Sequence, residues 1–138
     1  MTSSTTSNLD DAMTDTDRVG AIDHQCTHIW MVRTFLKHAD ETEDDEDLRA
    51  ITRDLYDFIL AVGPLTDDTD TLKYLRMAKK KLRRLRGALE LYEAIQPEVS
   101  GHTNFVMAAR SLRGAVNAIE SIMTGWKPTV VKSNPASA

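Results

Sequence analysis

Cysteine is nearly absent from this chain of 138 residues, whose single example is Cys26. No disulfide can therefore form within one chain, and a lone cysteine is typical of a reducing compartment, so we expect a cytoplasmic location. The N-terminal stretch MTSSTTSNLDDAMTDTD lacks a basic segment followed by an apolar one, so it does not resemble a secretory signal. No apolar run approaches the roughly 20 residues that a membrane-spanning helix needs, and we expect no membrane partner.

Signatures of common enzyme chemistry are missing too. The sequence has no Gly-rich phosphate loop, nucleophile elbow or Cys-x-x-Cys pair. No glutamate is followed three residues later by a histidine, the spacing used in di-iron bundles, and the acidic run Glu41–Asp47 lacks the glycine that an EF-hand loop requires at its sixth position. These absences leave enzymatic activity undecided, favour a non-enzymatic protein and give no reason to expect a cofactor.

Amphipathic helical patterns fill the middle of the chain. Gly63-Pro64, Pro97 and Gly125 are expected helix stops, because glycine accepts the left-handed turn after a helix and proline cannot continue one. Four such helices with short connections predict an all-α fold, an antiparallel up-down-up-down four-helix bundle. The expected helices cover about 18–39, 45–62, from just after Asp68 to about 95, and from 102 or 103 to 124.

The apolar stripe of each helix indicates the core. On the first helix Trp30, Met31 and Phe35 are expected to widen the stripe. We divide the chain into a disordered tail (1–18), the bundle (19–126) and a flexible C-terminal tail (127–138), because both ends lack periodic apolar positions. The predicted stripes are Ile22, Cys26, Ile29, Val32, Leu36 and Ala39; Leu48, Ile51, Leu55, Phe58, Ile59 and Val62; Leu75, Ala78, Leu82, Leu85, Leu89 and Tyr92; and Phe105, Ala109, Leu112, Val116, Ile119 and Met123.

One helix is strongly basic although the net charge of the chain is -4. Between Leu72 and Leu89, LKYLRMAKKKLRRLRGAL contains eight lysines and arginines and no acid. At 100° per residue the cations form a face opposite the apolar stripe. The candidate partner-binding residues on this face are Arg76, Lys79, Lys80, Arg83, Arg84 and Arg86.

The basic face leads to our first hypothesis, a non-enzymatic helical interaction module that binds an anionic macromolecule or an acidic protein surface. A homodimer, in which a second copy supplies the acidic run Glu41–Asp47, is also considered. The aromatic residues of the helix, Tyr74 and Tyr92, lie on its core side, so contact with phosphates is favoured over stacking on unpaired bases. The structural alternative is a solvated exterior, partly neutralised by nearby aspartates: Asp54, Asp57, Asp67, Asp68 and Asp70.

Histidines suggest a second hypothesis, a metal-binding bundle. His24 and His28 lie one helical turn apart and could share a metal if Asp67, Asp68 or Asp70 completed the shell. Two ligands do not make a site, so we assign no metal. A second possible location is the end of the bundle that gathers His38, Asp40, Glu41, Glu43, Glu98 and His102, where a solvated acidic loop is the structural alternative.

A third hypothesis comes from Arg33–His38, RTFLKH. This segment is similar to the Arg-x4–6-His pattern of HEPN-family ribonucleases, which are all-helical and often dimeric. The resemblance covers these six residues, and Thr34 stands where that family commonly has Asn, Asp or His. It implies RNA cleavage by Arg33 and His38. The structural alternative for Arg33 is packing of its stem at the edge of the core or an ion pair across the bundle.

Overall fold

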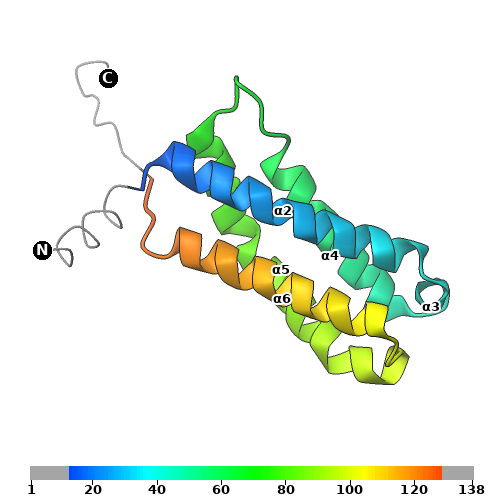
Figure 1. Ribbon diagram of the computed structural model, residues 1–138. Coiled ribbons are helices and arrows are strands. Elements are labelled where there is room, and N and C mark those ends of the chain that lie inside the picture. Colours follow the sequence, from blue (N-terminus) through cyan, green and yellow to red (C-terminus); the bar gives the residue numbers. More distant parts are fainter. Residues whose placement is uncertain (1–12, 129–138) are drawn as a thin grey trace, which may run out of the picture.

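The computed structural model of the chain describes residues 13–128, and within that range the fold is entirely helical, with five helices and no strand (Figure 1). The parts of the two predicted tails before Met13 and after Pro128 lie outside the described residues. The helices are α2 (Asp15–His38), α3 (Asp40–Glu43), α4 (Glu46–Val62), α5 (Thr71–Val99) and α6 (Thr103–Met123).

Side-chain caps explain where the helices begin. Thr14 and Asp17 form a reciprocal capping box, so α2 starts at Asp15 and not at the expected position 18. The carboxylates of Asp45 and Asp70 each accept a backbone N–H in the first turn of α4 and α5. Each cap satisfies a backbone N–H that the helix itself cannot pair.

Pro97 does not end α5, contrary to the prediction. The helix continues to Val99, and Pro97 lies in its last turn. A proline there removes one backbone hydrogen bond, and the end of the helix is closed by other contacts. The backbone N–H of Ser100 donates to the Gln96 carbonyl at 3.0 Å, and the Gln96 side chain donates to the Ser100 carbonyl at 2.9 Å.

Part of the acidic run between α2 and α4 forms the short helix α3. Thr42 is buried at its centre, and its hydroxyl donates to the Leu36 carbonyl at 2.5 Å. Arg49 on α4 donates to the Glu43 carbonyl at 2.5 Å, which satisfies an acceptor at the C-terminal end of α3. The predicted interruption of the apolar pattern is therefore a folded segment that joins the two long helices.

The core lies between the four long helices. α2 contacts α4, α5 and α6, and α5 also contacts α4 and α6. The predicted stripes are buried, with Ala39, Ile59, Leu82 and Ala109 only partly so. The expectation for Trp30 and Met31 is wrong, because these side chains remain 43% and 61% exposed.

The positions of Trp30 and Met31 explain their exposure. Trp30 lies at the edge of α2 that faces α4, with its ring 6.4 Å from that of Tyr56. Met31 lies at the opposite edge, where it lines a depression together with Met107 of α6. Phe35 is partly buried against the core, with its ring 4.9 Å from that of Phe105.

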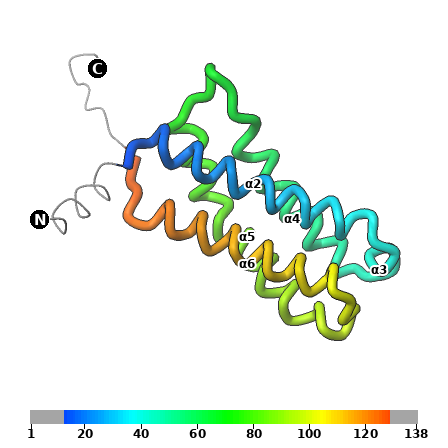
Figure 2. The backbone as a smooth tube through the Cα atoms, in the orientation of Figure 1, coloured from blue at the N-terminus to red at the C-terminus, as the bar shows by residue number. Residues whose placement is uncertain are grey.

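The start of α2 and the end of α6 lie side by side (Figure 2). The Arg18 guanidinium donates to the Ile122 carbonyl, and the Trp126 indole N–H donates to Asp15 at 2.9 Å. Trp126 is only 6% exposed although it follows the last helix. These contacts fasten the two ends of the described fold to each other.

Candidate functional site

The basic face predicted from the sequence is exposed on α5. Arg76, Lys80 and Arg83 follow one another at spacings of four and three residues, so they lie along one stripe. All three are exposed, and none forms an ion pair within residues 13–128. The stripe keeps this orientation because the opposite side of α5, including Leu75 and Leu85, is fully buried.

Two further cations of this face have weak intramolecular partners. Arg84 is 62% exposed and lies 4.0 Å from the Asp54 carboxylate on α4. Burial raises the pKa of Asp54 from its usual value, and the nearby Arg84 offsets only part of that rise. Lys79 lies 5.9 Å from the centre of the Trp126 ring. An exposed ion pair as long as that of Arg84 contributes little to stability. Both Arg84 and Lys79 are exposed and thus accessible to a partner.

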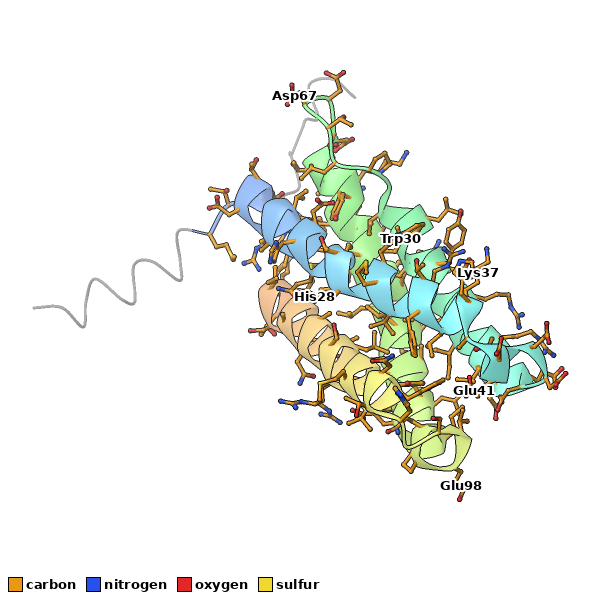
Figure 3. The ribbon with its side chains drawn as sticks, turned by 45° about the vertical axis from the view of Figure 1, so that its right-hand side comes forward. His28, Trp30, Lys37, Glu41, Asp67 and Glu98 are labelled. Atoms are coloured by element: carbon orange, nitrogen blue, oxygen red, sulfur yellow. The ribbon has the colours of Figure 1, made fainter. Side chains whose placement is uncertain are left out.

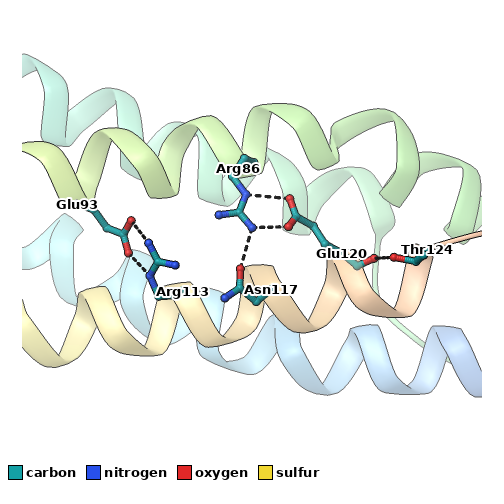
Figure 4. Close-up of polar contacts among 6 residues, drawn as sticks. All are labelled: Arg86, Glu93, Arg113, Asn117, Glu120 and Thr124. Atoms are coloured by element: carbon teal, nitrogen blue, oxygen red, sulfur yellow. Dashed lines mark hydrogen bonds and ion pairs between the residues drawn. The ribbon is translucent and has the colours of Figure 1, made fainter.

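Arg86 differs from the other predicted residues because the fold neutralises it (Figure 4). Its guanidinium donates to both carboxylate oxygens of Glu120 and, at 2.8 Å, to the Asn117 side chain. These bonds favour both charged groups, so they raise the pKa of Arg86 and hold the pKa of Glu120 below its usual value. We therefore leave Arg86 out of the candidate surface, which consists of Arg76, Lys79, Lys80, Arg83 and Arg84 and is called the α5 basic face.

A second ion pair crosses the same helix interface. The Arg113 guanidinium on α6 donates to both oxygens of Glu93 on α5, at 2.5 and 2.6 Å (Figure 4). Together with Arg86 and Glu120, this pair makes the α5–α6 seam a structural contact between side chains of opposite charge. The α5 cations that are available to a partner therefore lie away from this seam.

The acidic run and the α5 basic face occupy different regions. Glu41 and Glu98 lie at one end of the molecule and Asp67 lies at the other, in the connection that precedes α5 (Figure 3). The basic stretch occupies the first half of α5, between Lys73 and Arg86, whereas Glu98 is near the end of that helix. The acidic run therefore does not cover the basic stretch.

The two histidines proposed as metal ligands are neighbours on α2. Their rings are 6.1 Å apart, both side chains are exposed, and the Nδ1 atom of His28 lies 3.3 Å from the Ser111 hydroxyl. In the part of the chain that the structure describes, no three His, Cys, Asp or Glu side chains are placed to hold a metal ion. His24 and His28 thus come together without Asp67, Asp68 or Asp70.

At the other end, the predicted cluster is only partly assembled. His38 at the end of α2 and Asp40 and Glu41 of α3 line one depression of about 420 Å³ together with His102. Glu43 instead lines a different cavity. These residues do not form a metal-binding group among those the structure describes.

Arg33 and His38, the residues that resemble the ribonuclease pattern, line one cavity of about 610 Å³ between α2 and α4. The Arg33 guanidinium lies 4.9 Å from the centre of the Trp30 ring and 4.6 Å from that of the Tyr56 ring. Of the two structural alternatives for Arg33, the ion pair is absent among the described residues, and the guanidinium contacts two aromatic rings.

Sequence reasoning missed the other cations of this cavity. Lys37 on α2 and Arg49 and Arg53 on α4 line it together with Arg33. The sequence signal was present, since Arg33/Lys37 and Arg49/Arg53 are like-charge pairs at a spacing of four, one on each of the two long helices α2 and α4. Only the packing of α2 on α4 shows that the two pairs share one concavity.

None of the helices in residues 13–128 combines the length and apolar character that a bilayer span requires. Comparison with protein-family models, curated proteins and solved structures found no significant match.

Proposed function

We propose that this chain is an up-down-up-down four-helix bundle that acts as a non-enzymatic interaction module in the cytoplasm, with the α5 basic face binding an anionic macromolecule. The bundle is supported by the helix contacts, because each long helix packs on the one that follows it and α2 also packs on α6. The cytoplasmic location rests on the lone Cys26, because a chain with one cysteine cannot form an internal disulfide.

The observation that carries the binding proposal is the exposed stripe of Arg76, Lys80 and Arg83, which lacks ion pairs among the described residues. Like charges at this spacing disfavour the helix by about 0.2–0.5 kcal/mol per pair, and an anionic partner would remove that repulsion. Arginine and lysine bind phosphates and carboxylates by charge-assisted hydrogen bonds. No aromatic platform accompanies the stripe on α5, since Tyr74 and Tyr92 are buried, and contact with backbone phosphates is the expected form of nucleic-acid binding.

The proposal is tested by removing two charges from the stripe. A Lys80→Gln/Arg83→Gln variant and a control Arg110→Gln/Lys127→Gln variant lower the net charge equally, and the control residues are exposed cations outside α5. Binding of a labelled RNA duplex and of polyglutamate is measured by fluorescence anisotropy over a series of salt concentrations.

We expect the stripe variant to weaken binding and to reduce the salt dependence by about one unit of slope for each lost phosphate contact. Binding of the duplex only would identify a nucleic-acid partner, and binding of polyglutamate only would identify an acidic protein. Equal losses in the two variants would show that net charge alone is responsible and would remove the proposal.

A ribonuclease is the second candidate function, favoured by the shared cavity of Arg33 and His38. It is tested by incubating the purified chain with single-stranded RNA and comparing it with Arg33→Ala and His38→Ala. Cleavage that depends on both residues supports this function, whereas cleavage that survives either substitution comes from a contaminant.

Metal analysis of protein purified without a histidine tag tests the metal-binding alternative at His24 and His28, which predicts at least stoichiometric metal.

A further inference from the structure

The cavity between α2 and α4 presents an arginine that is held in place before any ligand arrives. The Arg33 guanidinium rests against the Trp30 and Tyr56 rings, at 4.9 and 4.6 Å from their centres. Contact with a ring uses the face of the guanidinium and leaves the N–H groups at its edge free to donate. The Arg33 side chain forms no hydrogen bond or ion pair with any residue from 13 to 128. It is therefore oriented without its donors being used.

Two other cations around the cavity are also uncommitted. Lys37, one turn after Arg33, and Arg53 on α4 are exposed and lack ion pairs among the described residues. Figure 3 shows Trp30 and Lys37 along the same edge of α2. Arg49, the fourth cation, already donates to the carbonyls of Thr42 and Glu43 and serves a structural role at the end of α3. Three cations from two helices thus remain for a ligand.

Acidic side chains line the same cavity without pairing to these cations. Asp40, Glu43 and Asp57 contribute carboxylates, none of which lies within 4.0 Å of a cation of the cavity. A ligand made only of phosphates would be repelled by these carboxylates. A phosphate ester that also carries hydroxyl groups would satisfy both kinds of lining, because phosphate oxygens accept from the cations and hydroxyls donate to the carboxylates.

We propose that the α2–α4 cavity binds a small phosphate ester with free hydroxyl groups, a sugar phosphate or a nucleotide, through Arg33, Lys37 and Arg53. The cavity volume of about 610 Å³ is within the range of small-molecule sites. Arg33 is the main phosphate ligand, because contact with the Trp30 and Tyr56 rings restricts the motion of its side chain and lowers the conformational entropy lost on binding. This site is independent of the α5 basic face, which lies on another helix.

The test is isothermal titration calorimetry of the whole chain with ribose 5-phosphate, AMP and inorganic pyrophosphate at one ionic strength. We expect ribose 5-phosphate and AMP to bind more tightly than pyrophosphate. Tighter binding of AMP than of ribose 5-phosphate identifies a nucleotide site, and equal binding identifies a sugar-phosphate site. Tighter binding of pyrophosphate, or no binding of any probe at millimolar concentration, would overturn the proposal.

Matched variants locate the binding. Arg33→Lys keeps the charge but loses the two-pronged donor. Arg53→Gln removes a cation that does not lie over either aromatic ring. Each substitution is expected to weaken binding about tenfold. Circular dichroism checks that both variants fold. If Arg33→Lys does not fold, Arg53→Gln still tests the assignment. Lys80→Gln/Arg83→Gln, which tests the α5 basic face, should bind the probes unchanged. Wild-type affinity in Arg53→Gln, or loss of affinity in the α5 variant, would refute the assignment.

Discussion

Two buried tyrosines on α5 provide a sharp test of the packing, because removing their hydroxyl groups should have opposite effects. Tyr74 and Tyr92 are both essentially inaccessible, at 2% and 0% exposure. The Tyr92 hydroxyl donates to the Phe105 carbonyl of α6 at 2.8 Å. The Tyr74 hydroxyl lies near Cys26 and Asp23 but forms no hydrogen bond of normal geometry with any described residue. One hydroxyl therefore stabilises the fold, and the other is buried at a cost.

The magnitudes follow from the usual energies of buried polar groups. Tyr92→Phe should lower the free energy of unfolding by about 1 kcal/mol, the net value of a typical hydrogen bond. Tyr74→Phe should raise it by about 1 kcal/mol, because an unpaired buried hydroxyl loses its hydrogen bonds to water. The exposed Tyr56 provides a control, Tyr56→Phe, for which we expect a change of less than about 0.5 kcal/mol.

Urea unfolding followed by circular dichroism measures these differences. For a chain of this size, about 1 kcal/mol corresponds to a shift of roughly 0.5 M in the unfolding midpoint, upward for Tyr74→Phe and downward for Tyr92→Phe. Destabilisation of both variants by the same amount would refute the reasoning. It would mean that the Tyr74 hydroxyl has a partner, for which the neighbouring Cys26 and Asp23 are the candidates.

Three further predictions concern individual side chains. Arg86 holds the pKa of Glu120 below its usual 4.5, so the pair stabilises the fold above pH 4.5, and that stabilisation is lost as the pH falls through the pKa of the folded state. Glu120→Gln should therefore lower the free energy of unfolding at pH 7 by about 0.5–1 kcal/mol. It should also remove this acid dependence of stability in urea titrations. Burial raises the pKa of Cys26 from 9.0 to about 12, so stability should fall as the pH rises above 9, and thermal unfolding of Cys26→Ala should show a smaller fall. Thr14→Ala removes the cap that pairs with Asp17 and should cost about 1 kcal/mol in urea unfolding, whereas no change would contradict the capping box.

The local patterns of the sequence predicted the helices well, because amphipathic periodicity and capping residues act over a few neighbours. The end of α4 at Val62 follows from Gly63, whose φ of 77° is one that glycine adopts without strain. Pro97 was misjudged because its effect depends on position, and in the last turn it removes only one backbone bond. The first turn of α2 was missed because its polar residues carry no apolar period, although Thr14 and Asp17 are a recognisable cap.

The same sequence could identify cations but not their partners. The positive charges of α5 are plain in the primary structure, yet Arg86 differs from Arg83 only because Glu120 of α6 reaches one and not the other. Exposure of Trp30 was hidden for a similar reason, since a helical projection shows where an apolar stripe is centred and not how far its neighbours cover it.

The sequence alone therefore determined the helical class, the approximate helix bounds, most of the buried stripes and the presence of a basic segment. All of these depend on the spacing of residues within one helix. Only the tertiary structure decided which charges are neutralised, that Trp126 returns to contact Asp15, and that Arg33 and Arg53 share one cavity. These features depend on the packing of residues far apart in the chain, where distance and orientation, and not spacing along one helix, determine which groups meet.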